Sequence, residues 1–358
     1  MRLLFDINHP VQVHLLRHPL AELARRGHEC HVVARDKDVT LPLLERFGIP
    51  HRVLAPVGRG TWGRLRELGQ RELKLLVMAR ELRPRLIIGT SAHAARIARL
   101  VGARSVVVND DDASAVPLFR WLAYPLASAI VTPDCLRHEN HGQRHLTYAS
   151  YQQLFYLHPN RFRPDAEVRG RLRLPAGQAY AVVRLSALAA HHDRGIRGIG
   201  EELVLALRDR LAGRIQLFVS SEGPIPPRLE PLRLPVRPER LHDVLAFAEF
   251  YLGDSQSVTA EAAVLGTPAF RMTDFLGRLS YLRELESYGL AFGFKPGQTD
   301  ELIQEVERVL AMEDRRAVFA ARRARMLAEK IDPLPWFLEV IERLGQESRP
   351  ARGRTPEA

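Results

Sequence analysis

The sequence predicts two α/β domains, each built around a doubly wound parallel sheet. Short apolar runs alternate with amphipathic helical stretches, and the loops between them are short, as in sheets whose strands are joined by helices. A single segment near residue 158 interrupts this alternation. A length of 358 residues is also what two domains of ordinary size require.

The first half contains apolar strands separated by helices. The run 3–7 ends at the polar turn Asn8-His9-Pro10, and leucines at helical spacing follow as far as Arg26. Gly27 is then a typical helix terminator. The further strands expected here are 28–34, 52–54, 86–88, 105–108 and 129–131, and the further helices are 40–47, 64–82 and 92–100.

The second half repeats the alternation after a linker, because residues 157–164 hold turn formers without periodicity. Helices separate the expected strands, which are 179–183, 216–219, a short one near Leu234, 250–252 and 269–271. Residues 300–344 are largely helical in pattern. We therefore expect a first domain over 1–157, a second over 158–335, a helix over 336–346 that crosses back to the first domain, and a disordered tail over 347–358.

The composition, 46% hydrophobic and 26% charged, is that of an ordinary globular protein. The chain begins with a strand, so we expect no signal peptide, and no stretch of about 18 apolar residues is free of charge or proline. The two cysteines, Cys30 and Cys135, have no partners at metal-ligand spacing. Together these features predict a reduced, cytoplasmic protein.

The formal net charge of +10 comes from arginines spread along the whole chain. A high-GC genome that favours arginine over lysine explains this pattern, and anionic substrates or peripheral contact with an anionic membrane surface are the alternatives. A basic helix and the aromatic signature of RNA-binding domains are both absent from the sequence, which argues against nucleic acid as a partner.

The segment 253–268 carries the most specific chemical signal. A strand ends at Leu252 and a helix begins near Ser257, so that backbone N–H groups and the helix dipole could bind a diphosphate. Ser255 and Ser257 add hydroxyl donors, and Glu261, one turn further on, could accept hydrogen bonds from both hydroxyls of a ribose. The alternative is that Ser255 merely caps the helix and Glu261 is solvated.

This segment resembles the nucleotide-sugar site of the GT-B superfamily, particularly of the non-hydrolysing UDP-N-acetylglucosamine 2-epimerases. Their pattern is Asp-Ser-Gly-Gly, then a Glu, then Leu-Gly-x-Pro. The matching residues are Asp254, Ser255, Glu261, Leu265, Gly266 and Pro268. Gln256 and Ser257 replace the paired glycines, which leaves the backbone less freedom to approach phosphates.

Over nearly its whole length the chain is more similar still to domain of unknown function 354, a family of predicted glycosyltransferases. The stretches that carry this resemblance are 6–10, 13–14, 25–29, 109–110, 131–133, 156–162, 220–223 and 253–271. The resemblance implies an α/β chain of GT-B architecture, in which two Rossmann-like doubly wound parallel-sheet domains face a central cleft. It also implies a nucleotide-sugar donor on the second domain and an acceptor on the first.

In the first domain the resemblance implies that the loop after the first strand lines the cleft, which makes Asn8 and His9 candidates there. His14, in the matching pair Val13-His14, is our candidate for a general base, because an imidazole titrates near neutrality. The alternative is a histidine on the helix surface, in a chain that contains 14 histidines.

The run Asn109-Asp110-Asp111-Asp112 follows strand 105–108, at the edge of the sheet where ligands bind. We expect Asp110 or Asp111 to bind the acceptor, with Asp111 as a second candidate base. Three successive carboxylates also suggest a metal, but neighbouring side chains point in different directions. Since GT-B transferases usually need no bound metal, the resemblance implies no cofactor and no metal site.

In the second domain Arg184 follows a strand at a place where GT-B enzymes commonly hold phosphate, and arginine binds phosphate oxygens in a bidentate manner. A surface arginine is the alternative. Ser220, Glu222 and Gln256 are the other expected donor contacts. His192, within His191-His192-Asp193, and His242 complete the candidates.

The leading functional hypothesis is a metal-independent glycosyltransferase that uses a nucleotide-diphosphate donor, with UDP as the expected nucleotide and a glycan, a lipid-linked or a small-molecule acceptor. The first alternative is a UDP-N-acetylhexosamine 2-epimerase. The characteristic Gly-Thr-Arg-Pro-Glu opening of those enzymes is replaced here by Asp6-Ile7-Asn8-His9-Pro10, which argues against it. The second alternative is a catalytically silent protein that binds nucleotide sugar.

Overall fold

The computed structural model describes residues 1–54, 60–175, 177–186 and 199–347. It divides the chain into two compact units, of which unit 1 contains 1–156 together with 331–358 and unit 2 contains 157–330. The sequence had placed the boundaries at 157 and 335. The expected tail over 347–358 lies, apart from its first residue, outside the described residues.

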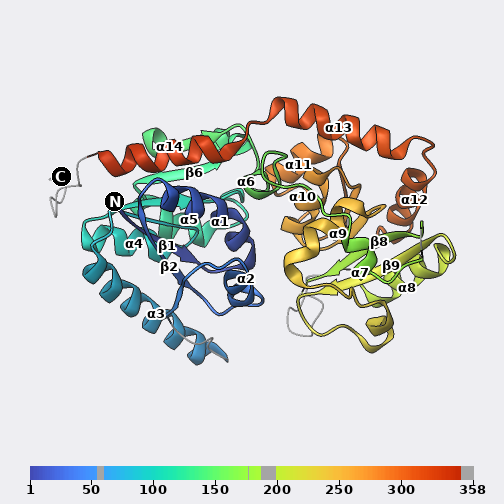
Figure 1. Ribbon diagram of the computed structural model, residues 1–358, viewed down its shortest axis with the longest axis horizontal. Helices are drawn as coiled ribbons and strands as arrows, with labels where there is room; N and C mark the ends of the chain where they lie inside the picture. Colours follow the sequence, from blue (N-terminus) through green and yellow to red (C-terminus); the bar gives the residue numbers. More distant parts are fainter. Residues whose placement is uncertain (55–59, 176, 187–198, 348–358) are drawn as a thin grey trace. The chain divides into compact units, whose positions relative to one another are not determined.

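Unit 1 is built on a seven-stranded sheet in the order β3-β2-β1-β4-β5-β6-β7, and all its neighbouring strands are parallel (Figure 1). The strands are β1 (Arg2–Ile7), β2 (Glu29–Ala34), β3 (Arg52–Val53), β4 (Leu86–Gly89), β5 (Arg104–Val108), β6 (Ala129–Pro133) and β7 (His145–Tyr148). The central strands are mostly apolar because helices cover both faces of the sheet, and four of the six residues of β1 are hydrophobic and 0% exposed.

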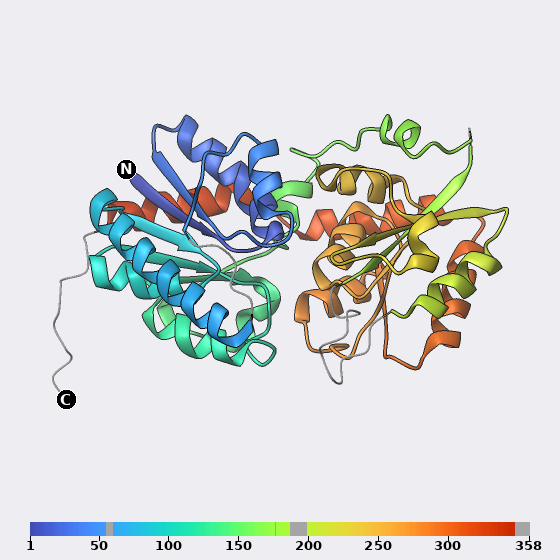
Figure 2. The ribbon, with the colours of Figure 1, turned by 90° about the horizontal axis from the view of Figure 1, so that it is seen from below.

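The helices of unit 1 form two layers. Figure 2 shows α1 and α14 on one face of the sheet and α3, α4 and α5 on the other. The helices are α1 (Pro10–Arg25), α2 (Thr40–Arg46), α3 (Gly60–Leu82), α4 (Ala92–Val101), α5 (Pro117–Ala123), α6 (Leu154–Leu157) and α14 (Pro333–Gln346), with short 3-10 turns at η1 (Tyr124–Leu126), η2 (Asp134–Glu139) and η3 (Gly142–Arg144). The helix α14 is thus part of unit 1, where it packs its buried residues Phe337 and Ile341 beside α1.

Unit 2 is built on a five-stranded parallel sheet in the order β12-β11-β10-β8-β9. The strands are β8 (Ala179–Leu185), β9 (Ile215–Ser221), β10 (Tyr251–Gly253), β11 (Ala269–Met272) and β12 (Ala291–Phe294). The helices are α7 (Val168–Arg171), α8 (Glu201–Arg210), α9 (Leu241–Phe247), α10 (Gln256–Leu265), α11 (Ser280–Ser287), α12 (Thr299–Leu310) and α13 (Arg315–Glu329), with 3-10 turns at η5 (Pro227–Leu232) and η6 (Pro238–Arg240). The predicted fold class, two doubly wound parallel-sheet domains, is confirmed.

One element of the sequence prediction is wrong. The short strand expected near Leu234 is reduced to a single bridge between Val219 and Arg233. Pro231 and Pro235 flank this position, and a proline cannot donate a ladder hydrogen bond, so the pairing does not extend into a strand.

In each unit the chain order reverses at one place in the sheet. The reversal lies between β1 and β4 in unit 1 and between β8 and β10 in unit 2. Loops that leave the carboxyl ends of such strand pairs diverge to opposite faces and open a crevice where ligands bind. We therefore expect ligands to bind at the loops after β1, β4, β8 and β10.

Among the described residues, no helix combines the length and the hydropathy that a membrane span requires.

Candidate functional site

The loop after β10 places a helix N-terminus at the switch point of unit 2. The helix α10 begins at Gln256. The residue that precedes it, Ser255, makes no side-chain hydrogen bond to the first turn of the helix. The backbone N–H groups of that turn are thus not capped by Ser255, and they combine with the helix dipole to favour an anion. Ser257 is half-buried in the same turn.

Asp254 joins the two loops at this switch point. Its Oδ1 accepts a hydrogen bond from the backbone N–H of Ser186, just after β8, at 2.7 Å. The residue is 4% exposed, and burial raises the pKa of its carboxyl group. Asp254, which matches the sequence motif, thus connects the loop after β10 to the backbone at the end of β8.

Arg184, Ser220 and Glu222 are brought together by the pairing of β8 with β9. Arg184 Nη1 donates to Ser220 Oγ at 2.7 Å, and Arg184 Nη2 lies 3.3 Å from Glu222 Oε1. The guanidinium side chain is 18% exposed, so it is partly desolvated but still reachable. Since β10 pairs with the other side of β8, this cation and the start of α10 belong to the same edge of the sheet.

Gln256 is held by a buried arginine. Its Oε1 accepts a hydrogen bond from Arg271 Nη1 at 2.7 Å, and its Nε2 donates to Thr273 Oγ1 at 3.3 Å. Arg271 is 0% exposed and forms an ion pair with Glu286 at 2.9 Å. The side chain of Gln256 is therefore anchored to β11 and the residue that follows it.

Glu261 and His242 form a buried pair between α10 and α9. The two side chains are each 5% exposed, and Glu261 Oε1 lies 3.2 Å from His242 Nε2. The ring of His242 also packs edge-on against Phe162, at 6.2 Å between ring centroids. Glu261 and His242, both predicted from the sequence as site residues, thus contact each other. The carboxylate of Glu261 faces this imidazole, and its contact with a ribose stays a prediction.

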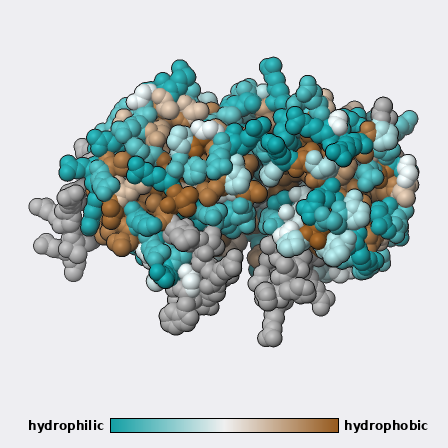
Figure 3. All heavy atoms as spheres, turned by 60° about the horizontal axis from the view of Figure 1, so that its bottom comes forward, coloured by the Kyte–Doolittle hydropathy of each residue, from teal (hydrophilic) through white to brown (hydrophobic). Residues whose placement is uncertain are grey.

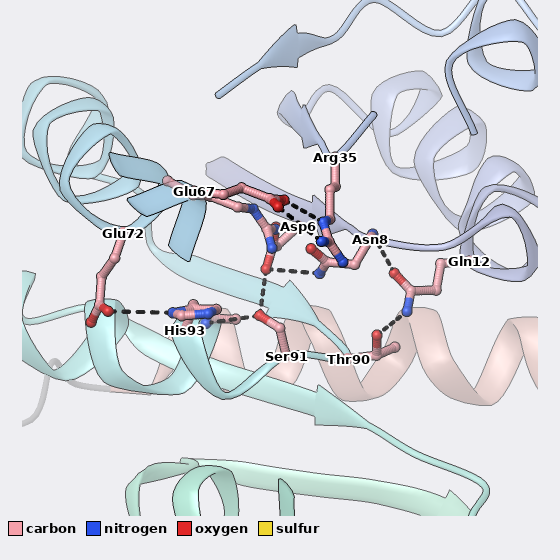
Figure 4. Close-up of polar contacts among 11 residues, drawn as sticks. Asp6, Asn8, Gln12, Arg35, Glu67, Glu72, Thr90, Ser91 and His93 are labelled. Atoms are coloured by element: carbon pink, nitrogen blue, oxygen red, sulfur yellow. Dashed lines mark hydrogen bonds and ion pairs between the residues drawn. The ribbon is translucent and has the colours of Figure 1, made fainter. Parts of the chain in front are cut away.

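In unit 1 a polar network occupies the switch point between β1 and β4 (Figure 4). Asp6 is fully buried, and its carboxylate accepts hydrogen bonds from Ser91, from Asn8 Nδ2 at 3.2 Å, and from Arg71 of α3. Gly89 permits this close approach, because a Cβ there would lie 3.0 Å from the carbonyl oxygen of Asp6.

Further contacts join the loops around Asp6. Gln12 Oε1 accepts a hydrogen bond from the backbone N–H of Asn8 at 2.6 Å, and Gln12 Nε2 donates to Thr90 Oγ1. Arg35, after β2, makes a two-point ion pair with Glu67 of α3, with N–O distances of 2.5 and 3.1 Å. Figure 4 shows these contacts gathered around the ends of β1 and β4, so this edge of the sheet carries a connected polar network.

His93 lies in the first turn of α4, beside this network. Its Nδ1 is 3.5 Å from Glu72 Oε2, and 16% of its side chain is exposed (Figure 4). Burial and, next, the positive charge of Arg71 lower the pKa of His93 below its usual value near 6.5, while Glu72 opposes the shift. At neutral pH the imidazole is consequently neutral, the form that accepts a proton.

The three first-domain candidates nearest the N-terminus take different positions. Asn8 belongs to the network, and His9 is the first residue outside α1, where its ring accepts the Val11 N–H at 3.4 Å. His14 lies one turn inside α1, is 7% exposed, and packs against Phe47 and Tyr156 with centroid distances of 5.6 and 5.4 Å. The structure thus places His14 in the core rather than in the loop.

The acidic run after β5 lies at the same sheet edge. Burial, followed by repulsion from Asp111, raises the pKa of Asp110 well above its usual value, and burial with Asp112 raises that of Asp111. Asn109 Nδ2 donates to the carbonyl of Asp111 at 2.6 Å. Separately, Asp112, His138 and Glu139 place one possible ligand atom each within 4.8 Å of one another. Of the remaining candidates, His192 lies outside the described residues.

Sequence reasoning missed Asp6, Arg71 and His93 as one group. A carboxylate inside the apolar run 3–7 was a usable signal, because a charged side chain in a buried strand requires a partner. The partner itself is 65 positions away, so only the fold reveals it.

Comparison with known proteins supports the fold. Three solved structures superpose on almost the whole chain. A Listeria monocytogenes protein assigned as a UDP-N-acetylglucosamine 2-epimerase superposes with a TM-score of 0.70 at 14% identity, over 99% of both chains. MnaA of S. aureus in complex with UDP gives 0.67 at 13% identity, over 96% of this chain and 95% of that one. The spinosyn forosaminyltransferase SpnP gives 0.62 at 17% identity, over 96% and 99%.

The chain has the GT-B fold. No family model matches it and no curated protein matches its sequence, so the resemblance to domain of unknown function 354 stays a prediction. The GT-B neighbours include both epimerases and glycosyltransferases, and at these identities the likeness concerns the fold alone.

Proposed function

We propose that this GT-B protein is a glycosyltransferase that takes a sugar from a UDP-linked donor and needs no bound metal. The observation that carries the proposal is the switch point of unit 2, where the start of α10 and the Arg184 guanidinium lie at one sheet edge. Backbone N–H groups and a partly buried arginine are what a diphosphate requires. The presence of UDP in the complex of the structural neighbour MnaA supports the choice of nucleotide.

In this proposal unit 2 holds the donor. Ser255, Ser257 and the first N–H groups of α10 bind the diphosphate together with Arg184, which exchanges its contact with Glu222 for phosphate oxygens. Asp254 and Gln256 keep the loop in place through Ser186 and Arg271. Glu261 and His242 form the neighbouring wall, where Glu261 would bind the ribose.

Unit 1 supplies the acceptor side, with His93 as the general base. Its imidazole takes the proton from an acceptor hydroxyl, the oxygen of which forms the new bond to the anomeric carbon. The bond from that carbon to the diphosphate breaks, and UDP departs with the electron pair. Glu72, 3.5 Å from the ring, stabilises the imidazolium that results. Asp111 is the second candidate for this role.

The proposed reaction is tested by incubating the protein with a mixture of nucleotide sugars and acceptors and following it by mass spectrometry. Transfer of sugar, or slow release of free sugar and UDP, supports the proposal. Formation of an epimer of the donor, or binding without turnover, would replace it with one of the two alternative functions.

We expect Arg184→Ala to weaken UDP binding by roughly ten- to a hundredfold, because it removes charge-assisted hydrogen bonds to phosphate. Glu222→Gln should strengthen binding or leave it unchanged, since Glu222 competes with phosphate for the same guanidinium. Isothermal titration calorimetry measures both, with Arg208→Ala on α8 as the control for loss of a positive charge. Equal affinities for Arg184→Ala and the control would contradict the donor site.

We expect UDP binding and transfer to survive EDTA, because the N-terminus of α10 and Arg184 already neutralise the diphosphate. Calorimetry and the transfer assay before and after chelation provide the measurement. Loss of both UDP binding and transfer, restored by Mg²⁺ or Mn²⁺ alone, would contradict this expectation. The residues to mutate next would then be Asp112, His138 and Glu139.

A further inference from the structure

The outer surface of α3, α4 and α5 is unusually apolar for a surface exposed to water. Among the described residues eight large hydrophobic side chains are exposed, and six of them lie on these three helices. The six are Leu68, Leu73, Val77, Leu100, Leu118 and Trp121. Trp121 is 73% exposed and Leu118 67%, so neither contributes to the core.

The three helices are neighbours and form one layer. In Figure 2 they cover the same face of the seven-stranded sheet, and α4 contacts both α3 and α5. Apolar residues appear in brown on the unit 1 surface in Figure 3. Leu73, Val77, Leu100, Leu118 and Trp121 therefore lie on the outer side of one helical layer, which we call the α3–α5 face. Leu68 falls on the same side of α3 as the buried Leu75 and borders this face.

The charges on the α3–α5 face are almost all positive. Its exposed charged residues among the described side chains are Arg66, Lys74, Arg80, Glu81, Arg99 and Arg120. Five cations against one anion give a surface that attracts negative charge, and the apolar side chains lie among them. A second copy of the chain docked face to face would bring two sets of cations together, which disfavours a symmetric dimer.

We propose that the α3–α5 face docks on the surface of an anionic lipid membrane. Arginine and lysine side chains bind lipid phosphates at the interface, while Trp121, Leu118 and Leu100 enter the region between headgroups and acyl chains. The helix α5 follows the loop that carries Asp111, and α4 begins beside His93. Docking thus brings the proposed acceptor side to a lipid surface. This last point rests on the proposed function, but the docking of the α3–α5 face does not depend on it.

The test is co-flotation of the full chain with vesicles of phosphatidylcholine alone and of phosphatidylcholine mixed with phosphatidylglycerol. We expect binding to the mixed vesicles, little to the neutral ones, and a decrease with added salt. Arg99→Glu/Arg120→Glu should weaken binding by at least roughly thirtyfold, and Leu118→Ser/Trp121→Ser should also weaken it.

The matched control is Arg208→Glu/Arg325→Glu, which makes the same change in net charge on exposed helices of unit 2, where the two arginine side chains are 44% and 67% exposed. It should bind like the unaltered protein. Failure of the unaltered chain to bind mixed vesicles, or equal losses in the control and the α3–α5 variants, would overturn the proposal. UDP calorimetry on every variant shows independently whether the donor site is intact.

Discussion

Replacing His93 with asparagine is expected to slow sugar transfer by about 10²–10⁴-fold, the range that a positioned general base contributes. UDP affinity should be unchanged, because His93 belongs to unit 1 and the donor contacts belong to unit 2. Single-turnover transfer assays and calorimetry with UDP separate the two effects. The matched variant is Asp111→Asn, which should cost far less.

The opposite ranking, with Asp111→Asn as the severe variant and His93→Asn as the mild one, would assign the base to the acidic run after β5. A parallel loss of UDP affinity in His93→Asn would instead indicate that His93 contacts phosphate. His14→Ala is useful in the same series, because His14 is 7% exposed in the core, so its replacement should lower stability more than the rate.

The pH dependence of transfer provides an independent check on His93. Burial and the charge of Arg71 lower its pKa, so the proton-accepting form prevails at neutral pH. As the pH falls through that lowered pKa, the imidazole becomes protonated and the rate should decline. The acidic limb of the profile should therefore lie below pH 6.5, the ordinary histidine value, and should disappear in His93→Asn. A limb above that value would contradict the assignment.

The strands that the sequence did not predict share a physical reason. β7 and β12 both lie at an edge of their sheet, and their residues are mostly half-buried. An edge strand covers less of the core than a central one, so selection for a long apolar run is weaker. The central strands, such as β1 and β4, are mostly apolar and were predicted within one or two residues.

The two candidate sites differed in how far the sequence could predict them. In unit 2 the informative residues follow one another between β10 and β11, so a contiguous pattern revealed the helix N-terminus. In unit 1 the network joins Asp6, Arg71 and Ser91, which are far apart in the chain. They meet because β1 pairs with β4 and because α3, which carries Arg71, packs against these strands. His14 was chosen because Val13-His14 matches the family pattern, but α1 already begins at Pro10 and this side chain is buried in the core.

The buried pair of Asp6 and Arg71 leads to the largest expected loss of stability. Asp6 is 0% exposed and Arg71 5%, and Asp6 is also the acceptor for Ser91 and Asn8. Asp6→Ala leaves the Arg71 charge buried without its carboxylate, which should lower the free energy of unfolding by about 3–5 kcal/mol. Urea denaturation followed by circular dichroism measures this loss, and part of it should appear as a separate transition of unit 1.

Two further variants distinguish an uncompensated charge from a general loss of packing. Asp6→Leu/Arg71→Met removes both charges and should recover most of the lost stability, because a buried ion pair is often replaceable by apolar side chains of similar volume. Glu29→Ala removes the exposed partner of Arg2, whose pair is 48% and 59% exposed, and should change the free energy of unfolding by about 0–1 kcal/mol. If Asp6→Ala proved as mild as Glu29→Ala, the buried pair of Asp6 and Arg71 would not be a major contribution to the stability of unit 1. A severe single variant with a stable double variant would show that the loss comes from the unpaired charge of Arg71 and not from lost packing.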